Sequence, residues 1–221
     1  MKSIVRPAVL AAIALSMGHA AHAASPVAIT EWMYSGVEFI ELTNLGNTAV
    51  DMTGWSFDDE SNTPGSTSLS AFGLVAAGES VILAEDEVSD FRNFWNLAAS
   101  VKVIGGNTHN LGRNDQIYIY DASGAVVDSL RFGDSSYVPG SIRAQDISGN
   151  PRDLAALNDA TSINWVLSSA GDAFGSINST VGTFVANPGV FALAPAVPEP
   201  TSVALLLAGV AVVGAAARRR A

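Results

Sequence analysis

The densest group of side chains that can bind a metal is a run of three acids in a polar loop. Asp58, Asp59 and Glu60 are followed by Ser61 and Asn62, so consecutive side chains here carry oxygen. Calcium prefers several oxygen ligands supplied by loops, which makes Asp58, Asp59 and Glu60 candidate calcium ligands. Their spacing does not match the EF-hand pattern, and the alternative is a solvated turn without a metal.

Glu38 and Glu41 are close in sequence and could be taken for a general acid/base pair, but their spacing argues against it. Glu38 and Glu41 belong to a segment, residues 37–44, whose side chains alternate with a period of two and which is therefore predicted to be a strand. Side chains an odd number of residues apart point to opposite faces of a strand. A glycoside hydrolase needs its two carboxyl groups about 5–9.5 Å apart at one site. The two glutamates therefore do not pair with each other, and each can pair only with an acid elsewhere in the chain.

Other catalytic chemistry has few residues available. The chain has no cysteine and three histidines, and His109 is the only histidine beyond the first 23 residues. A zinc site of the usual histidine/cysteine type therefore lacks ligands, and a Ser-His-Asp triad would depend on this one loop histidine. We expect no enzymatic activity and no cofactor apart from the calcium considered above.

The N-terminus has the features of a secretory signal peptide. Lys2 and Arg6 precede an apolar run that ends near Met17, and small residues follow at Ala21 and Ala23. The apolar run is shorter than the roughly 17 residues needed to span a bilayer. We therefore expect cleavage after Ala23 and removal of residues 1–23.

The C-terminus combines a Pro-Glu-Pro motif, an uncharged segment and a cluster of arginines. The uncharged segment has about the minimum length for a single transmembrane helix, and clustered arginines stay on the cytoplasmic side of a membrane. The two prolines keep the motif extended and outside the helix. The motif is Pro198, Glu199 and Pro200, the membrane segment is 201–217, and the arginines are Arg218, Arg219 and Arg220.

This order of features resembles the PEP-CTERM sorting signal, over residues 197–221. The resemblance implies that the chain is exported by a Gram-negative bacterium and held in the inner membrane by its C-terminal helix. It also implies processing by an exosortase, followed by delivery to the cell surface or the extracellular matrix.

The charge between the two ends is strongly negative. The whole chain has 11 basic and 21 acidic residues. Two of the bases lie in the predicted signal peptide and three in the arginine cluster, so without Glu199 the body carries 20 acids and six bases, a net charge of −14. Such a surface repels nucleic acid and anionic lipid, so we expect no nucleic-acid partner.

The body of the chain is predicted to consist mainly of short strands. Period-two patterns predict strands at 27–32, 37–44 and 80–84, together with a hairpin whose arms are 117–120 and 126–132. Phe91, Phe94 and Trp95 are spaced for one face of a short helix. Many short strands with one helix predict an all-β sandwich.

A second resemblance covers about half of the chain. Its motifs are Glu38–Leu42 with Asn44, Val50–Trp55, Ala77–Leu83, Asn114–Ile117, Tyr120–Asp121 with Gly124, Val127–Asp128, and Phe132–Gly133. In this order and spacing they resemble the lamin tail domain, which implies an immunoglobulin-like β-sandwich. We assign residues 24–134 to that domain, 135–167 to a C-terminal extension and 168–196 to a flexible linker rich in glycine, serine, asparagine and alanine. The expected structural core residues are Phe39, Ile40, Leu42, Gly54 and Trp55.

These observations together predict an exported, non-enzymatic surface or matrix module associated with exopolysaccharide or biofilm. Its expected partners are the export machinery, an exosortase, and an extracellular polysaccharide or surface protein. It would contact the membrane through the C-terminal helix before processing. Two alternatives are a polysaccharide-active hydrolase and a calcium-dependent adhesin.

Overall fold

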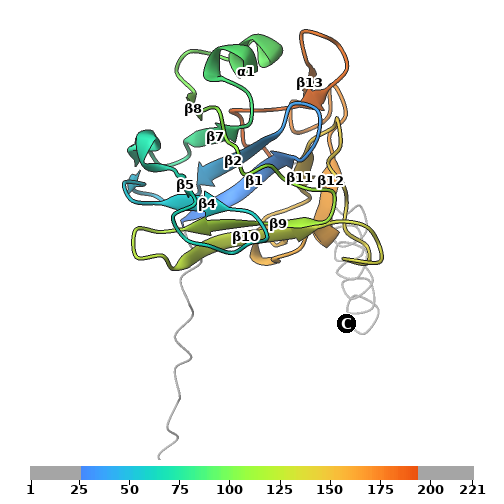
Figure 1. The fold of residues 1–221 in the computed structure, drawn as a ribbon. Coiled ribbons are helices and arrows are strands. Elements are labelled where there is room, and N and C mark those ends of the chain that lie inside the picture. The colour runs from blue at the N-terminus through green and yellow to red at the C-terminus, as the bar shows by residue number, and fades with distance from the viewer. Residues whose placement is uncertain (1–25, 194–221) are drawn as a thin grey trace, which may run out of the picture.

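The computed structural model describes residues 26–193, which form several β-sheets and a single short α-helix (Figure 1). This confirms the mostly β fold with one short helix predicted from the sequence. The larger sheet has six strands in the order β12-β11-β1-β2-β7-β8. Its neighbouring strands are antiparallel except β7 and β8. The strands are β1 Val27–Met33, β2 Phe39–Asn44, β7 Ser80–Ala84, β8 Lys102–Ile104, β11 Gly149–Pro151 and β12 Trp165–Leu167.

A second sheet has four strands in the order β10-β9-β4-β5 and faces the larger one. Two pairs of short strands, β3 with β6 and β13 with β14, complete the sheets. The bounds are β3 Val50–Asp51, β4 Ser56–Asp58, β5 Thr67–Ser68, β6 Leu74–Val75, β9 Asp115–Tyr120, β10 Val126–Phe132, β13 Ile177–Asn178 and β14 Val185–Ala186. Short 3-10 helices occupy Ser70–Phe72, Ala156–Asn158 and Ser162–Asn164.

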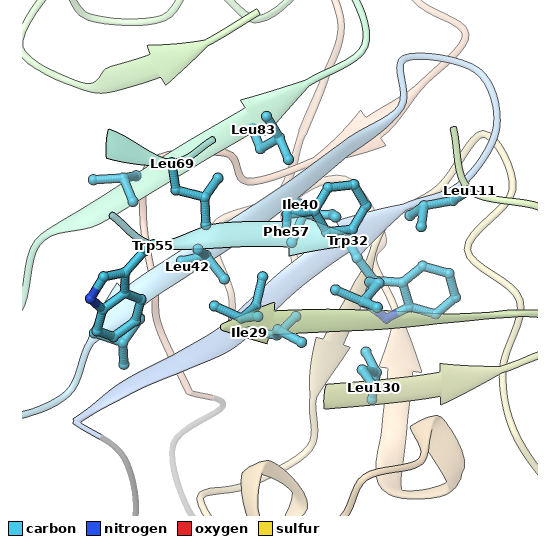
Figure 2. Packing of buried hydrophobic residues seen from close by; sticks show 14 of the residues in the cluster. Ile29, Trp32, Ile40, Leu42, Trp55, Phe57, Leu69, Leu83, Leu111 and Leu130 are labelled. Atoms are coloured by element: carbon cyan, nitrogen blue, oxygen red, sulfur yellow. The ribbon is translucent and has the colours of Figure 1, made fainter. Parts of the chain in front are cut away.

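The main apolar core lies between these two sheets. Trp32, Ile40 and Leu42 of the larger sheet meet Phe57 and Leu130 of the smaller one (Figure 2). The alternation of apolar side chains along each strand places one set of them on this inner face. The two sheets are therefore held together chiefly by buried apolar surface.

The larger sheet is also covered on its other face. Met33, Phe39 and Ile82 point away from the main core and form a second apolar cluster with Phe91 and Trp95 of the helix. The helix α1, Val88–Trp95, lies on the side of the sheet away from β9 and β10 (Figure 1). Strands β1, β2 and β7 are buried at every residue for this reason.

The predicted aromatic stripe explains why α1 forms and where it packs. Phe91 and Trp95 are four residues apart, so they lie on one helix face and are both buried. Phe94 packs against the same cluster, where it is partly buried. The helix ends at Asn96, which adopts the left-handed conformation with φ of 47°, a common termination for helices.

A β-bulge in β1 changes which side chains reach the outer face. Ile29 pairs with Leu42 and Glu31 pairs with Glu41, so β1 contains one residue more than β2 between these two pairs. Ile29 and Trp32 both belong to the main core, whereas strict alternation would place them on opposite faces. The bulge therefore turns Glu31 onto the same outer face as Glu41.

The flexible linker predicted for residues 168–196 differs from the structure over its described part. Phe174 and Ala186 are buried, and Phe184 packs against the outer apolar cluster. The small side chains of glycine, serine and asparagine let this segment lie close to the larger sheet and hydrogen-bond to it, as described below. Residues 194–196 lie outside the described part of the chain.

The residues around Gly54 and Trp55 form one end of the main core. Gly54 has φ of 82°, and a Cβ atom there would lie 2.9 Å from the Cβ of Ala122, so glycine is required on both counts. Trp55 follows directly and packs into the core with 9% of its surface exposed (Figure 2). The bend at Gly54 directs the indole of Trp55 into the space between the two sheets.

Trp55→Ala should lower the free energy of unfolding by about 3–5 kcal/mol, the usual cost of emptying a large aromatic site. Leu74→Ala is the control, because Leu74 is 65% exposed and should change stability by less than about 0.5 kcal/mol. Denaturant unfolding measures both. Equal stability of the two variants would contradict the placement of Trp55.

Candidate functional site

The residues predicted for sorting and signal cleavage lie outside the described part of the chain. These are Ala21, Ala23, Pro198, Glu199, Pro200, Arg218, Arg219 and Arg220. Within residues 26–193, no helix is long and apolar enough to cross a membrane. The expected cleavage site and transmembrane segment therefore stay predictions.

The acidic loop predicted to bind calcium mostly satisfies itself. Asp58 Oδ2 accepts hydrogen bonds of 2.6 Å from both Ser61 Oγ and Thr63 N, and Asp59 Oδ1 accepts one from Ser61 N. Burial acts to raise the pKa of Asp58, but these bonds outweigh it and hold the pKa below its usual value. Glu60 contributes its backbone N–H to Asp115 rather than a side-chain oxygen to its neighbours.

No metal-like grouping results from this loop. Across residues 26–193, no three aspartate, glutamate, histidine or cysteine side chains converge as metal ligands would. His109 is also engaged in structure, because its Nδ1 lies 3.0 Å from Thr67 Oγ1 in a polar loop.

The structure brings Glu41 to a partner that the sequence analysis did not identify. Glu38 and Glu41 lie on opposite faces, as expected, and Glu41 pairs across the strands with Glu31. Glu31 and Glu41 are both completely buried. The signal that could have found Glu31 is its position inside a strand, VAITEWM, whose other residues are apolar or threonine.

The two carboxyl groups receive hydrogen bonds from the chain that covers them. We call residues 185–193 the strap, because this segment crosses the outer face of the larger sheet after β13. Asn187 N donates to Glu31 Oε1 at 2.8 Å, and Gly189 N donates to Glu41 Oε2 at 2.6 Å. Gly189 has φ of 86° and a Cβ there would meet Val101 at 3.0 Å, so only glycine brings this N–H to the carboxylate without strain.

Small polar side chains complete the surroundings of the pair. Ser148 Oγ donates to Glu31, and Thr30 Oγ1 donates to Glu41 Oε1 at 3.0 Å. Asn150 Nδ2 links Ser168 and Asn187 at 2.8 and 2.9 Å. We call this set the polar layer; its members are Thr30, Glu31, Glu41, Thr43, Ser80, Ser148, Asn150, Ser168, Ser176 and Asn187, all buried.

Burial perturbs both carboxyl groups. Desolvation raises the pKa of Glu31 well above its usual value, and the charge of Glu41 raises it further. Desolvation likewise raises the pKa of Glu41, to about 7, against the effect of its hydrogen bonds. The ion pairs within residues 26–193 involve Glu79 and Asp134, so no lysine or arginine offsets the charge of the pair. Because no substrate can reach such buried groups, the pair is unsuited to catalysis.

Glu38 is buried and Asp128 is partly buried, both away from the polar layer. Glu38 Oε1 accepts a hydrogen bond from Leu111 N at 2.8 Å. Asp128 Oδ2 accepts one from Ile29 N at 2.7 Å, and so links β10 of the smaller sheet to β1 of the larger. Asp128 also lines a cleft of about 240 Å³ whose other walls are mainly apolar. Both Asp128 oxygens are engaged by backbone N–H groups, so the cleft offers a ligand little polar recognition.

A mixture of polar and aromatic side chains that solvent can reach lies on the outer face of the smaller sheet. Ile117, Ile119 and Leu130 point into the core, so Gln116, Tyr118, Ser129 and Arg131 point outward. Tyr118 is partly exposed and Arg131 is exposed. The guanidinium of Arg131 also lies 4.2 Å from the ring centroid of Tyr137. An aromatic ring beside hydrogen-bonding groups and a cation is suited to binding sugars.

The fold and its polar layer define a small, mostly β module whose C-terminal strap is packed into the body. The family model of the Lamin Tail Domain matches residues 20–134, about half of the chain. The chain therefore belongs to the lamin tail domain family. The model of the PEP-CTERM protein-sorting motif matches residues 196–220, so both resemblances seen in the sequence are confirmed. The motif implies an exosortase substrate that is first anchored in a membrane and then processed for the cell surface. No curated protein matches the chain significantly.

Glu38 and Asp128 make the stability of the fold depend on pH. Burial raises the pKa of Glu38 from 4.5 to about 8 and that of Asp128 from 3.8 to about 6. Between those limits the folded state binds more protons than the unfolded state. The free energy of unfolding therefore falls as the pH rises from about 4.5 to about 8.

We expect the melting temperature to be several degrees higher at pH 5 than at pH 8, since each pKa unit corresponds to about 1.4 kcal/mol. Glu38→Gln keeps an acceptor for Leu111 N and removes the titration of this one group, so it should make the dependence shallower, while the other buried acids keep part of it. Melting followed by tryptophan fluorescence measures both proteins. A wild-type melting temperature that rises between pH 5 and pH 8 would contradict the assignment.

Proposed function

We propose that this chain is a non-enzymatic module that an exosortase delivers to the cell surface or matrix, where it binds extracellular polysaccharide. The sorting motif supports the destination. The partly exposed Tyr118, flanked by Gln116, Ser129 and Arg131, is the single observation that carries the ligand class. We call these four residues the outer patch.

The chemistry of the outer patch suits an anionic or hydroxyl-rich polymer. A sugar ring can pack on the exposed part of Tyr118, as apolar ring faces do on aromatic side chains. Gln116 and Ser129 can exchange hydrogen bonds with hydroxyl groups, while Arg131 can pair with an acidic substituent. The net charge of −14 on the body opposes binding to nucleic acid and to densely anionic polymers alike, so the acidic substituents that Arg131 pairs with must be sparse in the polymer.

We further infer that the two facing sheets form an immunoglobulin-like sandwich and that residues 1–23 are removed during export. The family supports the first inference and the residue pattern of the N-terminus supports the second. The burial of Glu31, Glu38 and Glu41 supports a non-enzymatic role, because a polysaccharide hydrolase needs accessible carboxyl groups.

Tyr118→Ala should weaken binding to extracellular polysaccharide from producing cells at least about fivefold, equivalent to about 1 kcal/mol. Arg131→Ala should weaken binding to an acidic polymer and make it less sensitive to salt. Arg152→Ala, an exposed arginine outside the outer patch, is the matched control. Binding assays with the purified full chain in detergent would refute the site if all three variants bound like the wild type. New reducing ends in the polymer would instead indicate a hydrolase.

Deleting residues 197–221 should leave the described fold intact and change where the protein is found. The physical reason is that the deleted segment carries the motif, the expected membrane helix and the arginine cluster. Cell fractionation of the producing bacterium measures the location of both forms. The same location with and without the segment would contradict sorting by this motif.

A further inference from the structure

The polar layer under the strap contains negative charge that the protein does not balance. Glu31 and Glu41 are neighbours across β1 and β2, and opposed side chains in such a pair have Cβ atoms about 4.5–5.5 Å apart. Both residues have no exposed surface. Burying two ionised carboxylates without a positive partner is costly, so in the folded state either protons neutralise them or a cation lies near them.

The layer also contains oxygen atoms that lack partners. Glu31 Oε2 is buried and accepts no hydrogen bond from the described residues, whereas Glu31 Oε1 accepts two. Asn150 is 1% exposed, and its Oδ1 is likewise buried without a partner. Asn150 Nδ2 donates to Asn187 Oδ1, and the backbone N–H of Asn187 donates to Glu31, so Asn150 belongs to the same hydrogen-bond network as that carboxyl group. The unpartnered amide oxygen is thus an observation independent of the acidic pair, and it belongs to the same place.

A water, a proton or a divalent cation could occupy the space between these groups. The three differ in the positive charge and the hydrogen-bond partners that they provide. A buried water supplies hydrogen atoms to the unpartnered oxygens but no charge. A proton neutralises one carboxylate and leaves the other charged. A divalent cation neutralises both carboxylates and takes lone pairs from the unpartnered oxygens at the same time.

The ligand set favours calcium among divalent cations. The layer offers only carboxylate, amide and hydroxyl oxygens, which are the ligands of hard cations. Magnesium retains several waters and demands a strict octahedron, whereas calcium accepts six to eight oxygens in flexible arrangements. A fully buried layer with little room for water fits calcium better.

We propose that Glu31, Glu41 and Asn150 form a calcium site closed by the strap. Calcium bound there would fix the two carboxyl groups that receive the N–H groups of Asn187 and Gly189. Cation binding and docking of the strap would therefore support each other. This site is separate from the acidic loop and from the outer patch, so it does not depend on polysaccharide binding.

Thermal melting of the full chain in detergent, stripped with a chelator, tests the site. Calcium at a hundred times its dissociation constant should raise the melting temperature by about 5–10 °C, and magnesium should have a much smaller effect. Isothermal titration should show one calcium per chain. Failure of calcium to shift the melting temperature, or an equal shift in magnesium, would overturn the proposal and leave a proton or a water in that place.

Two variants separate this site from other acids. Glu31→Gln keeps the size of the side chain and removes one charge, so it should fold and lose the calcium response. Asp58→Asn is the matched control, since Asp58 also has a buried oxygen without a partner but lies in the acidic loop, outside the polar layer. Retention of the calcium response in Glu31→Gln, or its loss in Asp58→Asn, would overturn the assignment.

Discussion

The β-bulge between Ile29 and Glu31 is the constraint on which the outer half of the structure depends. Without the extra residue, Glu31 would point into the apolar core between the sheets. With it, Glu31 joins Glu41 on the outer face, and the fold must supply hydrogen-bond donors for two buried carboxyl groups. The strap and the small side chains of the polar layer supply them.

This arrangement makes the strap part of the folded body. The backbone N–H groups of Asn187 and Gly189 donate hydrogen bonds to the two carboxyl groups. Hydrogen bonds to charged acceptors are stronger than those between neutral groups. Pro198 of the sorting motif lies nine positions after Gly189, which limits their separation to about 30 Å even when the chain is fully extended. A lamin tail domain sorted by this motif is therefore held close to the place where the exosortase acts.

Local patterns of the sequence predicted much of the fold. The strands at 27–32 and 80–84, the hairpin at 117–132 and the helical aromatic stripe all appear in the structure, because period and turn residues are local properties. The packed strap was missed, since small polar residues are typical both of linkers and of segments that pack closely on a sheet. Glu31 was missed because a bulge depends on the pairing of two strands, which composition does not reveal. The calcium prediction for the acidic loop stays a prediction, because the sequence does not reveal that these side chains bond to their own turn.

Hydrogen exchange at the strap amides of the full chain tests the central claim most directly. If Asn187 and Gly189 donate to buried carboxyl groups, their amides should exchange far more slowly than unstructured ones, with protection approaching that of β1 and β2. Exchange of these two amides at the rate of an unstructured peptide, while β1 and β2 remain protected, would show that the strap is not docked and would contradict the account.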